Sequence, residues 1–318
     1  MTTICMRAVY WTFQQQPHRR TPPKHTGNSE SPPMKQLVLD ALDLMFSLRG
    51  LGWSWFNPRL RLPKETRNVQ SKASFILSCL TSSLCTMVLS DIAHYFVQSF
   101  DPIHLGTAAG GTIFDPTLPP LARYARSTVI TVLVGLVMCF SIETLHNITA
   151  LNCIVFFGQS PSQWPPISNN PWLSTSLSEL WGYRWHQSFR ELFGTFGGKP
   201  LAYLIGPMGG VMGSFLASGF FHNCGLWGMG RGSDFPRMGG FFVMMGMGVV
   251  IERGWKGVTG HRVGGVLGWI WTMCWVIGWG NMLMEAWGLR GLMGSLFVPD
   301  AFRIAPLIFG PLATEHRT

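Results

Sequence analysis

Residues 200–230 read PLAYLIGPMGGVMGSFLASGFFHNCGLWGMG and contain no charged side chain. A helix needs about 20 predominantly apolar residues to cross the hydrocarbon core of a bilayer, and this stretch is long enough. Four further apolar runs are 73–100 (interrupted by Asp91), 127–142, 238–251 and 263–284. A weaker run at 296–313 contains Asp300 and Arg303. The sequence therefore predicts an all-α polytopic transmembrane helical bundle with about five to six spans.

The composition of the whole chain supports this interpretation. Of 318 residues only 12% are charged, whereas soluble chains average roughly 25%. The 14 Trp and 37 Gly are typical of bilayer proteins, with glycine inside spanning helices and tryptophan at the interfaces. The composition excludes a disordered or collagen-like chain and argues against an ordinary soluble enzyme.

The formal net charge of +9 is distributed as orientation charges are in membrane proteins. Eleven of the 24 Lys and Arg lie in residues 1–72, and the others stand in short spacers between apolar runs. No basic stripe of the kind that binds nucleic acid is visible, so we expect no nucleic-acid partner. The seven cysteines are scattered singly, without a C-x-x-C pair or a Cys/His cluster, so the sequence supports neither a disulfide framework nor a metal site.

The chain divides into a tail and one membrane domain. Residues 1–35 contain a Gln run and several Pro residues, and we expect a disordered cytosolic N-terminal tail there, followed by a membrane-embedded domain over 36–318. Apolar residues recur at helical spacing over 37–48, which predicts an interfacial amphipathic helix. Residues 49–55 read RGLGWSW, a basic and aromatic pattern typical of interfacial anchors.

A second amphipathic helix is predicted over residues 178–196, at the cytoplasmic interface. Its apolar stripe consists of Trp185, Phe189, Leu192, Phe193 and Phe196. Tyr183, His186 and Arg190 fall on an adjoining stripe that is able to face a cavity. In the apolar run that follows, Gly206/Gly210 and Gly209/Gly213 have the Gly-x-x-x-Gly spacing that lets helix backbones approach closely.

An ionisable side chain at membrane depth is costly, which makes each one a candidate for a functional role. The candidates are Asp91, His94, Glu143, His146, His186, His222 and Glu285. His222 ends a charge-free run, where a neutral imidazole either acts as a general base or is anchored to the backbone at a helix end. The i, i+3 pairs Asp91/His94 and Glu143/His146 either relay protons or lock helices together.

The basic residues around His186 also allow two interpretations. His186 either contacts a substrate or sits at the interface against Trp185. Arg184 and Arg190 either grip the phosphates of an acyl-CoA, because a guanidinium forks onto phosphate oxygens, or serve as orientation charges.

Three motifs are more specific than the glycines and aromatic residues around them: RGLGWSW at 49–55, WGYRWHQSFR at 181–190 and SGFFH at 218–222. Together they resemble the wax synthase-like family, relatives of the membrane-bound O-acyltransferases. The resemblance covers roughly residues 37–313, and many fungal members resemble acetyltransferases of terpenoid or meroterpenoid pathways. In the family further spans usually precede the amphipathic segment, whereas this chain has a polar tail at that place.

The resemblance implies transfer of an acyl group, an acetyl group in such fungal members, from acyl-CoA to a hydroxyl of a lipophilic acceptor, a terpenoid or meroterpenoid of secondary metabolism. It implies that His222 is the general base and that His186 assists at the thioester or binds substrate. The implied contacts to substrate or CoA are Arg184, Trp185, Gln187 and Arg190. Acyl-CoA (acetyl-CoA) would be a co-substrate, with no metal and no permanently bound cofactor. The partners would be the acceptor and the lipid bilayer, in the endoplasmic reticulum.

Two other functions remain open on the sequence. One is a wax-ester synthase acting on long-chain alcohols, and the other is a non-enzymatic membrane transporter or scaffold. A transporter would be expected to show an internal repeat with two matching broken helices, and no convincing repeat is visible.

The position of His222 relative to His186 decides whether the implied mechanism is possible. If residues 201–221 formed one straight span, His222 would emerge roughly 30 Å from residues 184–190, at 1.5 Å per residue. A bend at Pro207 and the neighbouring glycines would place His222 deeper. The sequence therefore poses a structural test: whether the two histidines converge on one cavity.

Overall fold

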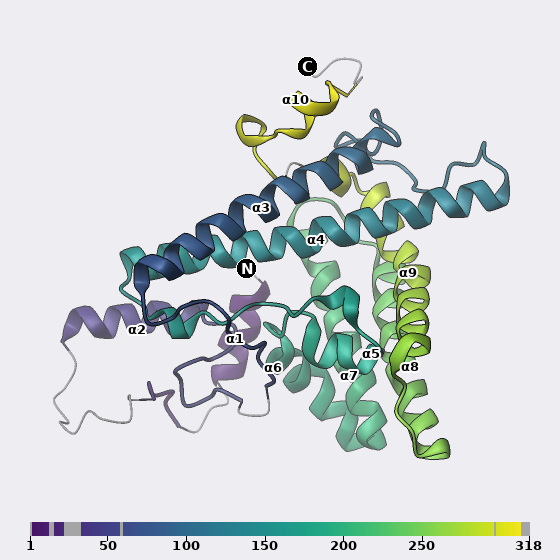
Figure 1. Ribbon diagram of the computed structural model, residues 1–318. Helices are drawn as coiled ribbons and strands as arrows, with labels where there is room; N and C mark the ends of the chain where they lie inside the picture. Colours follow the sequence, from purple (N-terminus) through teal and green to yellow (C-terminus); the bar gives the residue numbers. More distant parts are fainter. Residues whose placement is uncertain (1, 13–15, 22–32, 58–59, 296, 313–318) are drawn as a thin grey trace.

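The computed structural model describes residues 2–12, 16–21, 33–57, 60–295 and 297–312. Five helical segments are long and apolar enough to cross a membrane, and no strand forms in the described part of the chain (Figure 1). The long helices are α3 (Lys72–Ser99), α4 (Pro120–Phe156), α7 (Lys199–Gly228), α8 (Phe235–Thr259) and α9 (Gly265–Leu289). The prediction of a polytopic helical membrane protein is confirmed.

The long helices form two layers. α3 and α4 run side by side and lie across one end of the group formed by α7, α8 and α9 (Figure 1). Hydroxyl pairs join α3 to α4, with 2.8 Å between the Oγ atoms of Ser90 and Ser141. Thr131 of α4 joins the layers, because its Oγ1 donates to Oδ1 of Asn281 on α9 at 3.2 Å.

α4 is longer than its predicted apolar run. Its 37 residues give a length of about 55 Å, against about 30 Å for the hydrocarbon core. Hydropathy identifies only the apolar part of a helix. The predicted run 127–142 therefore falls inside α4 and does not give its ends. A helix of this length is either strongly tilted or continues beyond the membrane.

The third predicted span is not one straight helix. The backbone leaves helical geometry at Ile205 (φ −131°, ψ 22°) and at Gly206 (φ 74°, ψ −165°), just before Pro207. Gly206 permits the left-handed φ that other residues rarely adopt, and Pro207 has no backbone N–H to continue the hydrogen-bond ladder. The chain reverses direction there, so residues 201–221 do not form one straight span, and the bend considered at Pro207 is present.

The reversal produces a helical hairpin with arms at residues 190–205 and 207–228. The first arm comprises α6 (Arg190–Phe193), the π-helical η4 (Gly194–Gly198) and the start of α7. A Cβ added to Gly197 would lie 1.9 Å from the carbonyl oxygen of Gly213, and one added to Gly198 would lie 2.5 Å from Oγ of Ser214. The predicted close approach of glycines is confirmed, although the partner is the other arm of the same hairpin.

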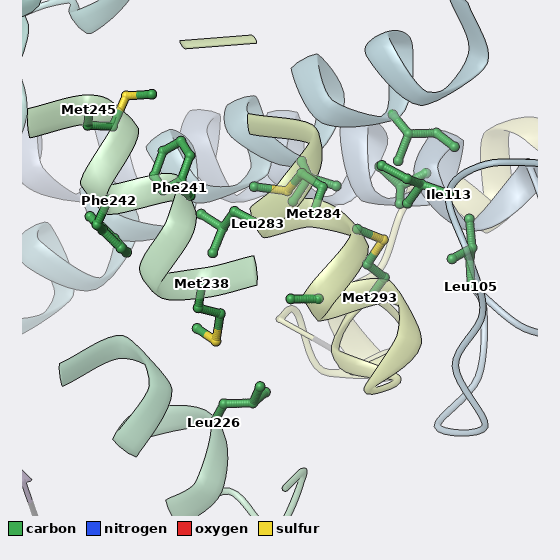
Figure 2. Packing of buried hydrophobic residues seen from close by; sticks show 14 of the residues in the cluster. Leu105, Ile113, Leu226, Met238, Phe241, Phe242, Met245, Leu283, Met284 and Met293 are labelled. Atoms are coloured by element: carbon green, nitrogen blue, oxygen red, sulfur yellow. The ribbon is translucent and has the colours of Figure 1, made fainter. Parts of the chain in front are cut away.

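A methionine-rich core lies where the layers meet. Figure 2 shows Met238, Phe241, Phe242 and Met245 of α8, Leu283 and Met284 of α9, Leu226 of α7, and Leu105, Ile113 and Met293 from connecting segments. Flexible methionine side chains fill irregular gaps between helices of different direction. The core therefore fixes the second arm of the hairpin against α8.

The described parts of the N-terminal region contain helices. α1 (Thr2–Thr12) lies within the segment predicted as a disordered tail, and Arg7 donates to the carbonyl oxygen of Met45 at 2.9 Å. α2 (Met34–Phe46) is the predicted amphipathic helix. The domain boundary at residue 36 stays a prediction.

The doubtful sixth span does not form in the described residues. The region 297–312 contains the short helices η6 (Asp300–Phe302) and α10 (Ala305–Phe309), and α10 packs against α3. The other short helices are η1 (Pro161–Gln163), η2 (Pro171–Leu173), α5 (Leu177–Glu179), η3 (Leu180–Arg184) and η5 (Leu292–Gly294).

Candidate functional site

His222 lies on the second arm of the hairpin, six residues before the end of α7. At 1.5 Å per residue, His222 lies about 9 Å from that end along the helix axis. Its Nδ1 is 2.8 Å from the carbonyl oxygen of Ser218, and the ring stacks on Phe242 with 4.6 Å between centroids. Because a carbonyl oxygen only accepts, Nδ1 carries the proton and Nε2 keeps its lone pair. The backbone contact thus leaves Nε2 as a basic nitrogen.

His186 lies on a non-helical segment between η3 and α6. Its Nδ1 is buried without a hydrogen-bond partner among the described residues. The ring packs against Trp185 at 5.0 Å and Phe189 at 5.9 Å between centroids. Burial lowers the pKa of His186 to about 4, and repulsion from His222, when that ring is protonated, adds to the shift. His186 is therefore neutral at physiological pH.

The hairpin brings the two histidines together. Phe189 packs on Phe221, with 4.9 Å between ring centroids, and Phe221 directly precedes His222. Phe193 also packs on Phe221, at 5.5 Å. We call His186 and His222 the histidine pair. The separation of roughly 30 Å expected for a straight span is avoided because the chain reverses at Gly206.

The two histidines lie in one cluster of aromatic rings. Neither of them lines either of the two hollows described next. One hollow, of about 380 Å³, is lined by Trp271, Cys274, Trp275, Gly278 and Trp279 on α9. Another, of about 10 Å³, lies beside His94 and Phe297. The structure thus shows that the two histidines lie close together, which is one half of the test posed by the sequence.

The segment carrying His186 differs from the predicted continuous helix. It begins with α5, continues as the π-helical η3, breaks over residues 185–189 and resumes as α6. The amide of Gln187 donates to the carbonyl oxygens of Trp181 at 3.1 Å and Trp185 at 2.7 Å. The side chain thus replaces the backbone donors that a continuous helix would supply, and the prediction of one helix over 178–196 is wrong.

Glu252 of α8 anchors the start of this segment and was missing from the sequence candidates. Its carboxylate is buried and accepts hydrogen bonds from the backbone N–H groups of Leu177 at 2.6 Å and Ser178 at 2.8 Å. The indole of Trp271 donates to the same carboxylate at 3.1 Å. An anion is stabilised by the free N–H groups at a helix start. The sequence signal was an acidic residue directly after the uncharged run 238–251.

The two predicted phosphate-binding arginines hold the segment together. Arg184 pairs with Glu179 at 2.7 Å, and its Nη1 donates to the carbonyl oxygen of Asn169 at 3.1 Å. Arg190, which is exposed, donates to the carbonyl oxygen of Gly182 at 2.7 Å and to Oε1 of Gln187 at 3.0 Å. Contacts of Arg184, Trp185, Gln187 and Arg190 with a ligand stay predictions.

The remaining ionisable candidates lock segments together. The carboxylate of Asp91 pairs with Arg303 at 2.8 Å and accepts from the backbone N–H groups of Ile304 and Ala305, both at 2.8 Å. The other contacts between segments are His94 with the carbonyl of Met293 (2.7 Å), His146 with that of Pro165 (3.1 Å) and Glu285 with the N–H of Ile113 (2.8 Å). Glu143 accepts from Asn147 within α4 at 3.4 Å. These contacts support the locking interpretation over a proton relay.

Replacing Arg303 by methionine tests this role. The change leaves the carboxylate of Asp91 buried without its cation, and breaking a buried ion pair costs about 3–5 kcal/mol. We expect a lower thermal unfolding midpoint in detergent, with unchanged turnover per folded molecule. Arg262→Met, at an exposed position, is the control. Loss of turnover at an unchanged midpoint would support a relay instead.

Comparisons with known proteins give one family match and several relatives of low identity. Residues 164–244, which include both histidines, match the model of the Membrane bound O-acyl transferase family. The chain is 24% identical to the O-Mevalon transferase yanI of Aspergillus niger over 277 residues, covering 77% of this chain and 59% of that protein. It is 25% identical to the Acetyltransferase sirH of Emericella nidulans, covering 53% and 38%, and 24% identical to the Acetyltransferase aurG of Calcarisporium arbuscula, covering 59% and 48%.

The chain spans 59% or less of the length of these three relatives. The matched segment contains the hairpin, the histidine pair and two of the three sequence motifs, those at 181–190 and 218–222. The predicted resemblance to the wax synthase-like relatives of the membrane-bound O-acyltransferases is therefore confirmed.

Proposed function

We propose that this membrane protein transfers an acyl group from acyl-CoA to a hydroxyl of a lipophilic acceptor. The observation that carries the proposal is the histidine pair, in which His222 has a free Nε2 and His186 stays neutral beside it. The match to the O-acyltransferase family over residues 164–244 supports the same reaction.

The reaction requires one base and a site that excludes water. Nε2 of His222 accepts the proton of the acceptor hydroxyl, whose oxygen attacks the thioester carbonyl carbon. The carbon–sulfur bond then breaks, and the CoA thiolate takes the proton from His222. His186 assists at the thioester or binds substrate as a neutral imidazole. The aromatic rings around the pair limit water and thus hydrolysis of the thioester.

The finer assignments rest on the relatives. Two of them are named acetyltransferases, which supports acetyl-CoA as the donor, with exposed Arg190 available for its phosphates. One is named an O-Mevalon transferase, so a donor carrying a mevalonyl group is a second possibility to test. We propose a terpenoid or meroterpenoid acceptor and a location in the endoplasmic reticulum.

Microsomes containing the full chain test the function directly. Labelled acetyl-CoA, a mevalonyl thioester and a long-chain acyl-CoA are each offered with hydroxylated terpenoids and with fatty alcohols. We expect a labelled terpenoid ester from acetyl-CoA. Esters formed only from long-chain donors and fatty alcohols would indicate a wax-ester synthase. Absence of any ester with all donors and acceptors would contradict the proposal and favour a transporter or scaffold.

A further inference from the structure

One indole N–H close to the histidine pair has no acceptor. Nε1 of Trp181 is buried and lacks a hydrogen-bond partner among the described residues, as does Nδ1 of His186. An indole nitrogen is a donor only, and leaving a buried donor unsatisfied costs about 1–3 kcal/mol. Such a group in a native structure needs an explanation, and a role in catalysis is one.

Trp181 lies next to the neighbours of both histidines. Its ring contacts that of Trp185 at 6.3 Å, and Trp185 packs on His186 at 5.0 Å. On the other side the Trp181 ring lies 6.5 Å from that of Phe241, between centroids. The next residue, Phe242, stacks on His222. The indole is thus placed in the aromatic cluster that surrounds the pair.

The position of this indole is fixed by its neighbours. The Trp181 backbone carbonyl accepts from Gln187, and the ring packs edge-on against Phe215 at 5.8 Å. The cluster therefore holds the unpaired donor in a fixed position beside the neighbours of both histidines.

We propose that the indole N–H of Trp181 donates a hydrogen bond to the carbonyl oxygen of the acyl thioester and stabilises the oxyanion that forms there. This inference rests on the acyl transfer proposed above. As the acceptor oxygen bonds to the carbonyl carbon, the carbonyl electron pair moves to oxygen and the hydroxyl proton moves to His222. Collapse re-forms the carbonyl, breaks the carbon–sulfur bond and releases CoA as the thiol after it takes that proton.

Trp181→Phe tests the inference because it removes the N–H and keeps an aromatic ring. Losing one oxyanion donor lowers kcat by about 10²–10³-fold, and we expect kcat and kcat/KM to fall together while KM for acyl-CoA stays nearly constant. Trp55→Phe is the matched control, since Nε1 of Trp55 is also buried without a partner but lies in the N-terminal region. That control should retain wild-type kinetics.

A second variant separates catalysis from packing. Trp181→His restores a ring N–H, and we expect it to recover part of the kcat lost in Trp181→Phe at a similar thermal unfolding midpoint. Wild-type kcat in Trp181→Phe, or no recovery in Trp181→His, would overturn the role of Trp181. In that case an inactive His222→Ala would still uphold the proposed function. Absence of any ester from the unsubstituted protein with every donor and acceptor would instead overturn the proposed function itself.

Discussion

Replacing His222 by alanine is expected to lower the rate of acyl transfer by about 10²–10⁴-fold, the contribution typical of a positioned general base. Nε2 of His222 is the free nitrogen of a ring whose Nδ1 is already bound to the carbonyl of Ser218 at 2.8 Å. His222→Gln keeps a polar side chain but supplies no base, so it should lose as much. The measurement is labelled ester formed per folded molecule in microsomes.

His261 provides the control for this experiment. It is exposed at the turn between α8 and α9, where its Nδ1 contacts the carbonyl oxygen of Thr259 at 2.8 Å. His261→Ala removes a histidine bound to the backbone in a similar way, and activity should stay at the wild-type level. Retention of more than about a tenth of the wild-type rate in both His222 variants would refute the assigned base.

Adding a single methyl group at Gly197 is expected to abolish most of the activity without touching either histidine. In Gly197→Ala the new Cβ would lie 1.9 Å from the carbonyl oxygen of Gly213, far inside van der Waals contact. The arms must separate, and a displacement of about 1 Å in a catalytic site can cost about 10²-fold in rate. We expect a similar loss here, together with a lower thermal unfolding midpoint.

Gly194→Ala is the same substitution three residues earlier on the same arm. A Cβ at Gly194 would meet no atom within 4 Å, so this variant should behave as the wild type. Equal activity in the two variants would show that close contact of the arms does not position the histidine pair. Loss in Gly197→Ala alone would establish that it does.

The positions of the five long apolar helical segments were predictable because runs without charged residues can be found directly in the sequence. The reversal at Gly206 was not, since an apolar stretch has the same hydropathy whether it is straight or folded back. Gly206 and Pro207 indicated a possible bend, but the outcome depends on whether the two arms fit closely.

The two histidines were identifiable from their motifs, whereas their surroundings were not. Glu252 matters because its carboxylate binds backbone N–H groups about 75 residues away, and Trp181 because its buried indole N–H has no partner among the described residues. No local sequence pattern reveals either property. Similarly, i, i+3 spacing suggested that Asp91 and His94 pair with each other. Each instead binds a C-terminal segment about 200 residues away.

The hairpin also changes the sidedness of the loops. A straight helix would put the polypeptide before Arg190 and the polypeptide after Gly228 on opposite faces of the bilayer. Because the chain reverses at Gly206, both ends of the hairpin emerge at the same face. The hairpin as a whole makes no net crossing, and α8 starts from the face at which the hairpin began.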